Sequence, residues 1–190
     1  FLPDSIVVTA SRYPTNERAV AQRLTVWQQA DIQDLAVASF DELLRSVGGV
    51  EVFSRTGFGI QSDLTMRGST FNGVLVLIDG MPLNDAMTGH FISDLPVPLA
   101  HIERIEVLRG PAAMLYGPDA LGGVIHIITR ASRLRAAAKL MREGAVQTIN
   151  GSHNLFGLDG SGYFQNGRSA WGAASSYLTS DGETVTNEAG

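Results

Sequence analysis

Residues able to do chemistry are present in this chain, but their spacing matches no common catalytic motif. Serine, histidine and acidic residues occur without the GxSxG turn of serine hydrolases and without the HExxH helix of zinc proteases. The glycines of GPDALGG lack the lysine and the spacing of a phosphate-binding loop. The absence of cysteine excludes disulfides, thiolate zinc sites and cysteine nucleophiles. We therefore expect a protein that is not an enzyme and that has no bound cofactor.

Two of the four histidines lie in segments that suggest different roles. His90 lies in a polar loop and could be an axial ligand, because histidine is the usual one. A single loop histidine is more often polar surface, and this alternative stays open. His126 lies within the apolar run GVIHIITR, so we expect it to pack inside a sheet.

Two arginines and one terminal segment are suited to binding other protein surfaces. Arg67 and Arg109 each end a predicted strand just before a glycine, and a guanidinium group binds carboxylates with two parallel hydrogen bonds. The alternative for each is a solvated or locally paired arginine. The stretch DSIVVTA, Asp4–Ala10, favours an extended form through its β-branched residues. Such a strand at a terminus can add to the sheet of a partner.

Two loops are candidates for contact with a ligand, since loops carry function more often than cores do. They span residues 54–62 and 83–94, and each mixes polar, aromatic and glycine residues. The alternative for any single residue is plain surface. The candidate ligand contacts are Arg55, Phe58, Gln61, Asn84, Asp85, His90 and Phe91.

Length and composition set the outer bounds. The chain has 190 residues and a formal net charge of −5, and this acidity argues against a nucleic-acid partner. It has no run of 18 apolar residues, so we expect no transmembrane helix. The 21 glycines among short apolar runs favour β structure with tight turns. The first residue is Phe1 rather than methionine, so we expect a processed or trimmed N-terminus.

The first 130 residues predict a compact α+β unit with short strands and long polar loops. A helix starts at a capping box formed by Ser39 and Glu42, and it ends at Gly48-Gly49. Helical turns are expected in QQADIQDLA and LAHIER, and Asp79-Gly80 is expected to be a structural turn. The predicted strands are RLTVW, VEVF, LTMRGS, GVLVLIDG, RIEVLRG and GVIHIITR, with a turn in PAAMLYGPDALGG.

Beyond Arg130 the sequence alternates with a period of two. Phe156, Leu158 and Phe164 fall on one parity, and Asp159, Ser161 and Gln165 fall on the other. The dipeptide NG at 166–167 signals a hairpin. The next run places Trp171, Ala173 and Tyr177 on one face. Strands of this kind are typical of a membrane β-barrel, and equally of an ordinary antiparallel sheet.

Three segments carry a resemblance to a known family. DSIVVTA resembles a TonB box, LTMRGS with VLVLIDGMPLND resembles the central plug signature, and IERIEVLRGPAAMLYGPDALGGVIHIITR resembles the closing plug signature. The chain therefore resembles a TonB-dependent outer-membrane receptor. The resemblance implies a TonB box and flexible segment over 1–23, a plug domain over 24–131, and the first strands of a 22-stranded transmembrane barrel over 132–190. About three strands fit there, so we expect a fragment cut inside the barrel.

The resemblance also implies a function. The receptor would take up a scarce large nutrient across the outer membrane of a Gram-negative bacterium. Arg67 and Arg109 would contact acidic residues of the barrel wall, and both loops would face ligand. The inner-membrane TonB protein would pair with the seven residues of the TonB box, which are Asp4, Ser5, Ile6, Val7, Val8, Thr9 and Ala10.

The identity of the nutrient is a finer implication of the same resemblance. The sequences of these segments are most similar to the cobalamin branch of the family, with ferric siderophore and haem receptors as alternatives. Calcium in the ligand loops and a surface lipoprotein partner stay open.

Two interpretations of other classes remain. One is a soluble plug-fold module for signalling or docking, although only three residues precede Asp4, where signalling members carry a further domain. The other is a purely structural β protein. If Asp4–Ala10 is the docking strand, it should be loosely held or disordered without its partner, and it should not be a central strand of the plug sheet.

Overall fold

A computed structural model gives the structure of the chain, which divides into two compact units, residues 1–133 and 134–190. The structure describes residues 6–7, 15–16, 23–35, 37, 39–54, 62–84, 97–132, 140–166 and 169–181. No helix among the described residues is long and apolar enough to cross a membrane.

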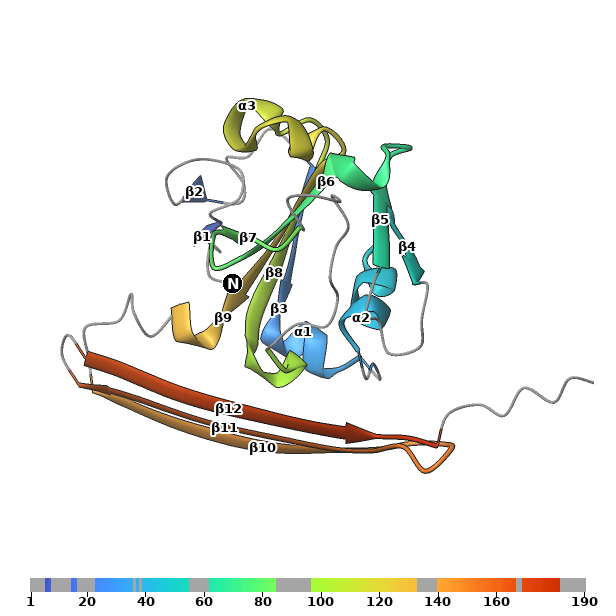
Figure 1. Cartoon of the computed structure of the whole chain (residues 1–190). Helices are drawn as coiled ribbons and strands as arrows, with labels where there is room; N and C mark the ends of the chain where they lie inside the picture. The colour runs from blue at the N-terminus through green and yellow to red at the C-terminus, as the bar shows by residue number, and fades with distance from the viewer. Residues whose placement is uncertain are drawn as a thin grey trace, which may run out of the picture. The chain divides into compact units, whose positions relative to one another are not determined.

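A five-stranded mixed sheet forms the centre of the first unit (Figure 1). Its order is β3-β8-β9-β6-β7, and only β6 and β9 pair in parallel. All described side chains of β6 and β9 are buried, which agrees with their continuous apolar sequence. The strands are β3 Arg23–Gln28, β6 Val74–Ile78, β7 Met81–Pro82, β8 Ile102–Arg109 and β9 Gly123–Thr129.

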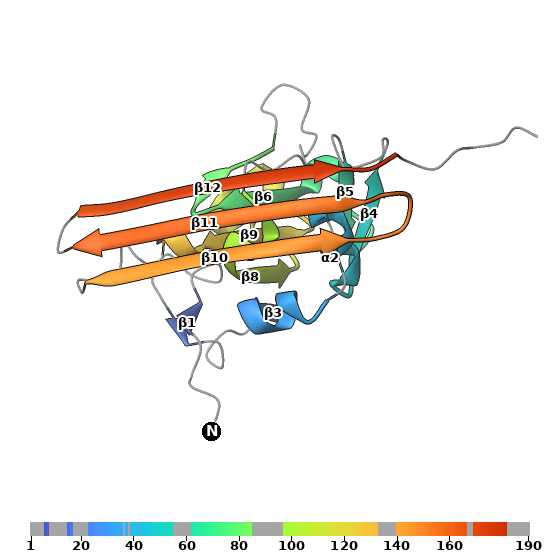
Figure 2. The same ribbon diagram turned by 90° about the horizontal axis from the view of Figure 1, so that it is seen from below.

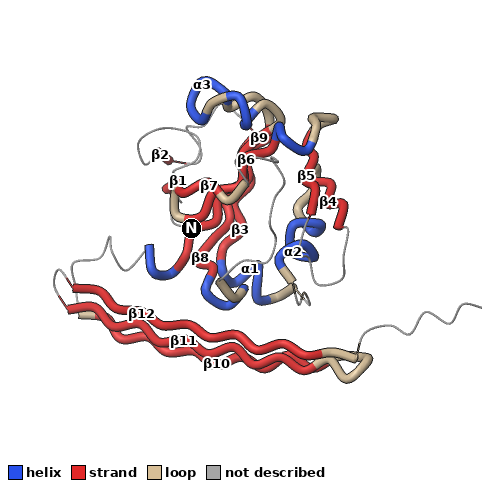
Figure 3. Tube along the Cα trace, in the orientation of Figure 1, coloured by secondary structure: helices blue, strands red, loops and turns tan. Residues whose placement is uncertain are grey.

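The larger core lies on one face of this sheet. There the helices α1 (Gln29–Gln33) and α2 (Phe40–Ser46) and the hairpin of β4 (Val50–Ser54) and β5 (Ser62–Met66) cover the buried residues of β6, β8 and β9 (Figure 3). A smaller apolar cluster includes Leu75, Leu108 and Val124. The sheet is therefore a buried middle layer, which fixes the positions of its strand ends.

The predicted helix α2 is confirmed. Ser39 has an extended backbone, and its hydroxyl accepts a hydrogen bond from the Glu42 amide at 3.4 Å. Leu43 and Leu44 are fully buried on its inner face. The helix ends at Ser46, and Gly49 has the positive φ of 82° that a left-handed residue after a helix needs.

The structure differs from the sequence prediction in three places. The strand expected at 64–69 is β5, which runs from Ser62 to Met66, because Arg67 and Gly68 have positive φ and turn the chain. The turn expected after Gly110 contains the short helix α3 (Ala113–Tyr116) and the 3-10 turn η5 (Pro118–Ala120). The loop after Gly80 begins with β7, which pairs with β6 through a hairpin closed by Asp79-Gly80. Among the described residues, η4 (Leu99–His101) is the helical turn expected in LAHIER, and η3 (Phe71–Gly73) is a further 3-10 turn.

The second unit contains a three-stranded antiparallel sheet in the order β10-β11-β12 (Figure 2). Its strands are β10 Met141–Asn150, β11 Phe156–Asn166 and β12 Ser169–Thr179, with 10, 11 and 11 residues. The predicted alternation is confirmed along β11, where Phe156, Leu158 and Phe164 are exposed while Asp159 and Gln165 are buried. Cross-strand pairing adds Trp171 and Tyr177 to the exposed row.

Candidate functional site

Arg67 and Arg109 lie close together at one end of the five-stranded sheet. A Cβ atom added to Gly110, the residue after Arg109, would lie 3.3 Å from Nη1 of Arg67. Likewise, a Cβ on Gly49 would lie 3.2 Å from Nε of Arg109. Nη1 of Arg109 donates a hydrogen bond to Oγ1 of Thr25 at 2.7 Å. Both guanidinium groups therefore pack against glycines that leave room for them.

The two arginines differ in their surroundings. Arg109 is half-buried and held by β3, whereas Arg67 is exposed and forms no ion pair with any residue in the described ranges. Arg23 is the register partner of Arg109, so a further positive residue belongs to this strand end. The arrangement can hold a carboxylate-bearing surface, because a guanidinium group presents a rigid fork of donors.

The glycines of the predicted closing segment bring these strand ends together. A Cβ on Gly122 would overlap the Ser69 side chain and lie 3.1 Å from the Met66 carbonyl oxygen. The Gly122 amide donates to the carbonyl of Gly73 at 2.7 Å, and its own carbonyl accepts from the Gly110 amide at 2.9 Å. The segments LTMRGS and LRGPAAMLYGPDALGG, which are distant in sequence, therefore meet by backbone packing.

A second polar cluster lies at the opposite end of β6 and β9. Oδ1 of Asp79 accepts from the Thr129 amide at 2.9 Å, and Oδ2 accepts from the Thr129 hydroxyl at 2.6 Å. The Ser132 amide donates to the same hydroxyl oxygen at 3.3 Å. Asp79 has φ of 48° and Gly80 has φ of 88°, which is the geometry of a two-residue hairpin turn. The predicted structural turn is confirmed, and its Asp79 side chain also holds the end of β9 through two hydrogen bonds to Thr129.

A buried polar row crosses β8 and β9 between these two ends. Nε of Arg104 contacts Oε1 of Glu106 at 2.8 Å, and Glu106, which is fully buried, is paired in register with His126. Burial lowers the pKa of His126, an effect that the charges of Glu106 and Asp79 oppose and that of Arg104 reinforces. Burial, followed by the charge of Glu106, raises the pKa of Tyr116. His126 packs within the sheet as predicted, whereas nothing in the sequence pattern distinguished Glu106.

Among the predicted ligand contacts, Asn84 is the one that the structure describes. Its Oδ1 accepts from the Val76 amide at 2.8 Å, and its Nδ2 donates to the Val74 carbonyl at 3.0 Å. The side chain thus continues the hydrogen-bonding edge of β6, and its contact with ligand stays a prediction. The remaining predicted contacts lie outside the described residues: Arg55, Phe58, Gln61, Asp85, His90 and Phe91.

Ile6 and Val7 are the described residues of the predicted TonB box. They form β1 (Ile6–Val7), which pairs antiparallel with β2 (Thr15–Asn16) in a separate two-stranded ladder. For these two residues, the expectation that the segment is not a central strand of the plug sheet is confirmed. The other predicted residues of the box lie outside the described residues, and their pairing with TonB stays a prediction: Asp4, Ser5, Val8, Thr9 and Ala10.

Comparison with known proteins gives the family. Residues 16–124, more than half of the chain, match the TonB-dependent Receptor Plug Domain. The chain belongs to the TonB-dependent receptor family. It is 43% identical over 126 residues to the Vitamin B12 transporter BtuB of Vibrio vulnificus strain YJ016, a match that covers 66% of this chain and 20% of that protein.

Solved structures of TonB-dependent receptors share the fold. The ferripyoverdine receptor of the outer membrane of Pseudomonas aeruginosa superimposes with a TM-score of 0.70 at 21% identity, over 92% of this chain and 22% of that one. The siderophore receptor PirA of Pseudomonas aeruginosa gives 0.58 at 26% identity, over 83% of this chain and 29% of that one. The chain thus spans between a fifth and a third of the length of these relatives.

These comparisons confirm the predicted fold class, a plug with a mixed sheet followed by antiparallel strands that match those of the receptors. Within the plug, the signature segments meet at the end that carries Arg67 and Arg109. The family is one of receptors, which agrees with the expectation of no enzyme. In the part of the chain that the structure describes, no group of at least three acidic or histidine side chains could hold a metal ion.

Proposed function

We propose that the receptor containing this chain takes up cobalamin across the outer membrane of a Gram-negative bacterium, with energy supplied by the TonB protein. The observation that supports this substrate is the 43% identity to a vitamin B12 transporter over the plug region. The siderophore receptors among the structural neighbours support the alternative of a ferric siderophore, and His90 keeps haem as a further one.

In this proposal the parts of the chain have separate tasks. The N-terminal segment presents an extended strand to which TonB adds its own, since strand addition supplies backbone hydrogen bonds in register. Arg67 and Arg109, at one end of the plug, seat it through acidic residues of the barrel wall. Because such polar contacts exchange with water more readily than an apolar interface does, the plug can be held firmly and still be moved.

A ligand panel tests the substrate. Calorimetry on the full-length receptor should show cobalamin binding far more tightly than haem or a ferric siderophore. Tighter binding of haem than of cobalamin would make haem the substrate, and His90→Ala should then abolish haem binding. Tightest binding of a siderophore would overturn the cobalamin proposal and leave TonB-dependent uptake in place.

Replacement of Val8 by proline tests the coupling to TonB. Proline removes a backbone donor and disrupts strand pairing, so Val8→Pro should abolish uptake of labelled ligand by whole cells while calorimetric affinity stays unchanged. The matched control Val8→Ile keeps the donor and the β-branched side chain, and it should transport normally. Uptake that survives the proline would refute the docking role of Asp4–Ala10.

A further inference from the structure

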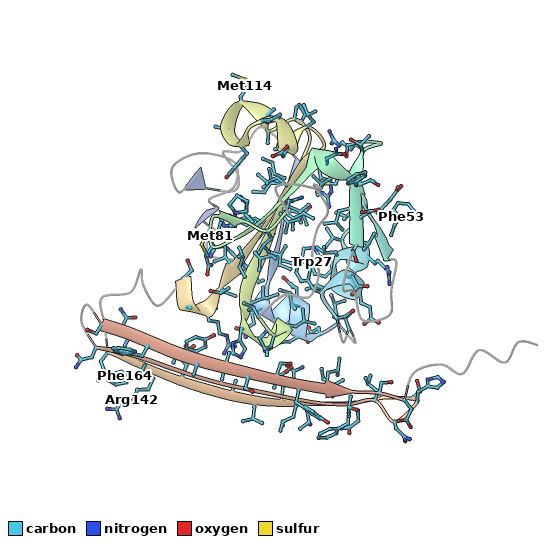
Figure 4. The ribbon with its side chains drawn as sticks, in the orientation of Figure 1. Trp27, Phe53, Met81, Met114, Arg142 and Phe164 are labelled. Atoms are coloured by element: carbon cyan, nitrogen blue, oxygen red, sulfur yellow. The ribbon has the colours of Figure 1, made fainter. Side chains whose placement is uncertain are left out.

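One face of the three-stranded sheet carries an arginine within an aromatic row. Arg142 on β10 is paired in register with Phe164 on β11, which is paired with Trp171 on β12. The guanidinium carbon of Arg142 lies 5.6 Å from the centre of the Phe164 ring, and Figure 4 shows the two side chains together at one end of the sheet. Trp171 is 72% exposed beside them. In the described part of the chain, Arg142 forms no ion pair.

A hollow of about 530 Å³ adjoins this row. Its floor is the next row toward the middle of the strands, where Gly162 of β11 is paired with Ala173 of β12. A Cβ on Gly162 would meet no atom within 4 Å, so the missing side chain leaves open space. Arg142, Phe164 and Trp171 line the hollow, together with Glu143, Tyr163 and Gly172 of the intervening positions.

The position of this hollow along the strands fits a membrane interface. Aromatic residues also lie near the other end of the same face, at Phe156 and Tyr177. About 27 Å of strand separates Phe156 from Phe164 at about 3.4 Å per residue. At a strand tilt of about 35–45° this spans about 19–22 Å of the membrane normal, somewhat less than the apolar band of about 25 Å between the aromatic girdles of a membrane barrel. Asn166 and Ser169 pair across a two-residue connection, whereas Gly151–Leu155 joins the other ends. Short connections face the periplasm in such barrels.

We propose that this hollow binds an anionic phospholipid of the periplasmic leaflet. The phosphate pairs with the Arg142 guanidinium, whose planar fork matches phosphate oxygens, and an acyl chain lies over Gly162 and Ala173. The charge selects the occupant, because a neutral apolar chain alone would leave the arginine uncompensated at the edge of the hydrocarbon. Glu143 lines the hollow, but it belongs to the alternate row of β10, whose Cβ atoms point to the opposite face of the sheet. This assignment rests on the proposed outer-membrane location.

Lipid titration of the purified, delipidated full-length receptor, followed by native mass spectrometry, tests the proposal. Dioleoyl phosphatidylglycerol should bind about tenfold more tightly than dioleoyl phosphatidylcholine. The phosphate of phosphatidylglycerol is accessible to charge-assisted hydrogen bonds from Arg142, whereas the choline cation shields the phosphate of phosphatidylcholine. Arg142→Gln should bring the two lipids to equal affinity. The control Arg45→Gln, which removes a plug arginine paired with Asp41, should leave the preference intact.

Substitutions of Gly162, which lines the hollow, and of Gly160, which does not, test whether the hollow itself binds the lipid. Gly162→Leu fills the floor and should weaken both lipids, whereas Gly160→Leu, two positions away on the same face and equally free of steric conflict, should behave as the wild type. If Gly162→Leu fails to assemble, Ala173→Leu fills the same space from β12. A headgroup preference that survives Arg142→Gln, or filled variants that bind as the wild type does, would overturn the proposal. Ligand binding and uptake are measured separately, so failure here is distinct from failure of the cobalamin assignment.

Discussion

Asp79 joins the turn between two strands to the end of a third strand. It closes the β6–β7 hairpin in a left-handed conformation and also bonds the amide and hydroxyl of Thr129, where β9 ends. Asp79→Asn tolerates the positive φ, but its amide cannot accept from the hydroxyl while its oxygen accepts from the Thr129 amide. We expect faster amide hydrogen exchange at β7 and at the end of β9 in the full-length receptor.

A double-mutant cycle gives this prediction its control. Thr129→Val removes the hydroxyl from the other side, so each single variant should lose the same bond. The double variant should then be less destabilised than the sum of the single ones, with a coupling of about 0.5–3 kcal/mol. Additive effects would mean that the Asp79–Thr129 bond contributes nothing to the stability of the plug.

His126 gives the plug a dependence on pH. Its folded pKa is lowered by burial from the ordinary 6.5, so the unfolded state binds more protons between the two values. The contribution of neutral His126 to the stability of the plug is complete above pH 6.5. It is lost as the pH falls from 6.5 toward the lowered pKa of the folded state. Protection factors of β9 amides should therefore be smaller at about pH 5.5 than at about pH 7.5.

His126→Gln should flatten this pH dependence, because glutamine does not titrate in the range. The control His153→Gln replaces an exposed histidine of the β10–β11 connection and should leave the slope unchanged. If His126→Gln keeps the full slope, the dependence belongs to another group.

At this scale the sequence indicated Arg67 and Arg109, because each ends a predicted strand just before a glycine. The structure places Arg67 beside Gly110, which follows Arg109, and their contact with a barrel wall stays a prediction. The use of Asn84 along the edge of β6 and the burial of Glu106 could not be predicted, because both depend on which strands become neighbours in the sheet.

At the scale of elements, the packing of Gly122 makes a sharp prediction. A methyl group there would overlap Ser69 and press on the Met66 carbonyl, so Gly122→Ala should destabilise the plug by about 1–3 kcal/mol. The measurement is amide exchange of β5 and β9 in the full-length receptor. Gly48→Ala is the matched control, since a Cβ there would meet nothing within 4 Å. Equal exchange in the two variants would contradict this role for Gly122.

The elements with a strong local signal were predicted well. The cap at Ser39 located α2, and the continuous apolar runs located β6 and β9. The short helix α3 has no buried residue and therefore no amphipathic pattern to reveal it. β7 has two residues and depends on the hairpin turn rather than on a strand pattern. The parallel pairing of β6 with β9 is a long-range choice that periodicity does not encode.

At the scale of the whole molecule, the two faces of the three-stranded sheet should tolerate charge very differently. Ser175 lies on the face of Trp171 and Tyr177, midway between the aromatic rows, and Ala174 lies on the opposite face. Ser175→Arg should cost about 2–4 kcal/mol in a membrane barrel, whereas Ala174→Arg, facing the lumen, should cost much less.

The readout for this pair is the folded fraction of full-length receptor in outer membranes, judged by heat-modifiable electrophoretic mobility. A lower folded fraction for Ser175→Arg alone supports a lipid-facing surface. Equal folded fractions would show that neither face meets lipid. From the sequence, alternation predicted these faces but could not distinguish a barrel from an ordinary sheet, because both require one apolar and one polar side.

The strand order of the plug sheet also delays the pairing of its first strand during synthesis. The edge strand β3 is made first of its sheet but pairs only with β8, and Thr25 and Arg109 are separated by 84 residues in sequence. At ~5–20 residues per second of synthesis, β3 waits about 4–17 seconds for its partner to be translated. In contrast, each of β10, β11 and β12 pairs with the strand next to it in the chain. The earliest strand of the plug sheet thus waits with an unpaired edge, and an unpaired strand edge is prone to aggregation during this interval.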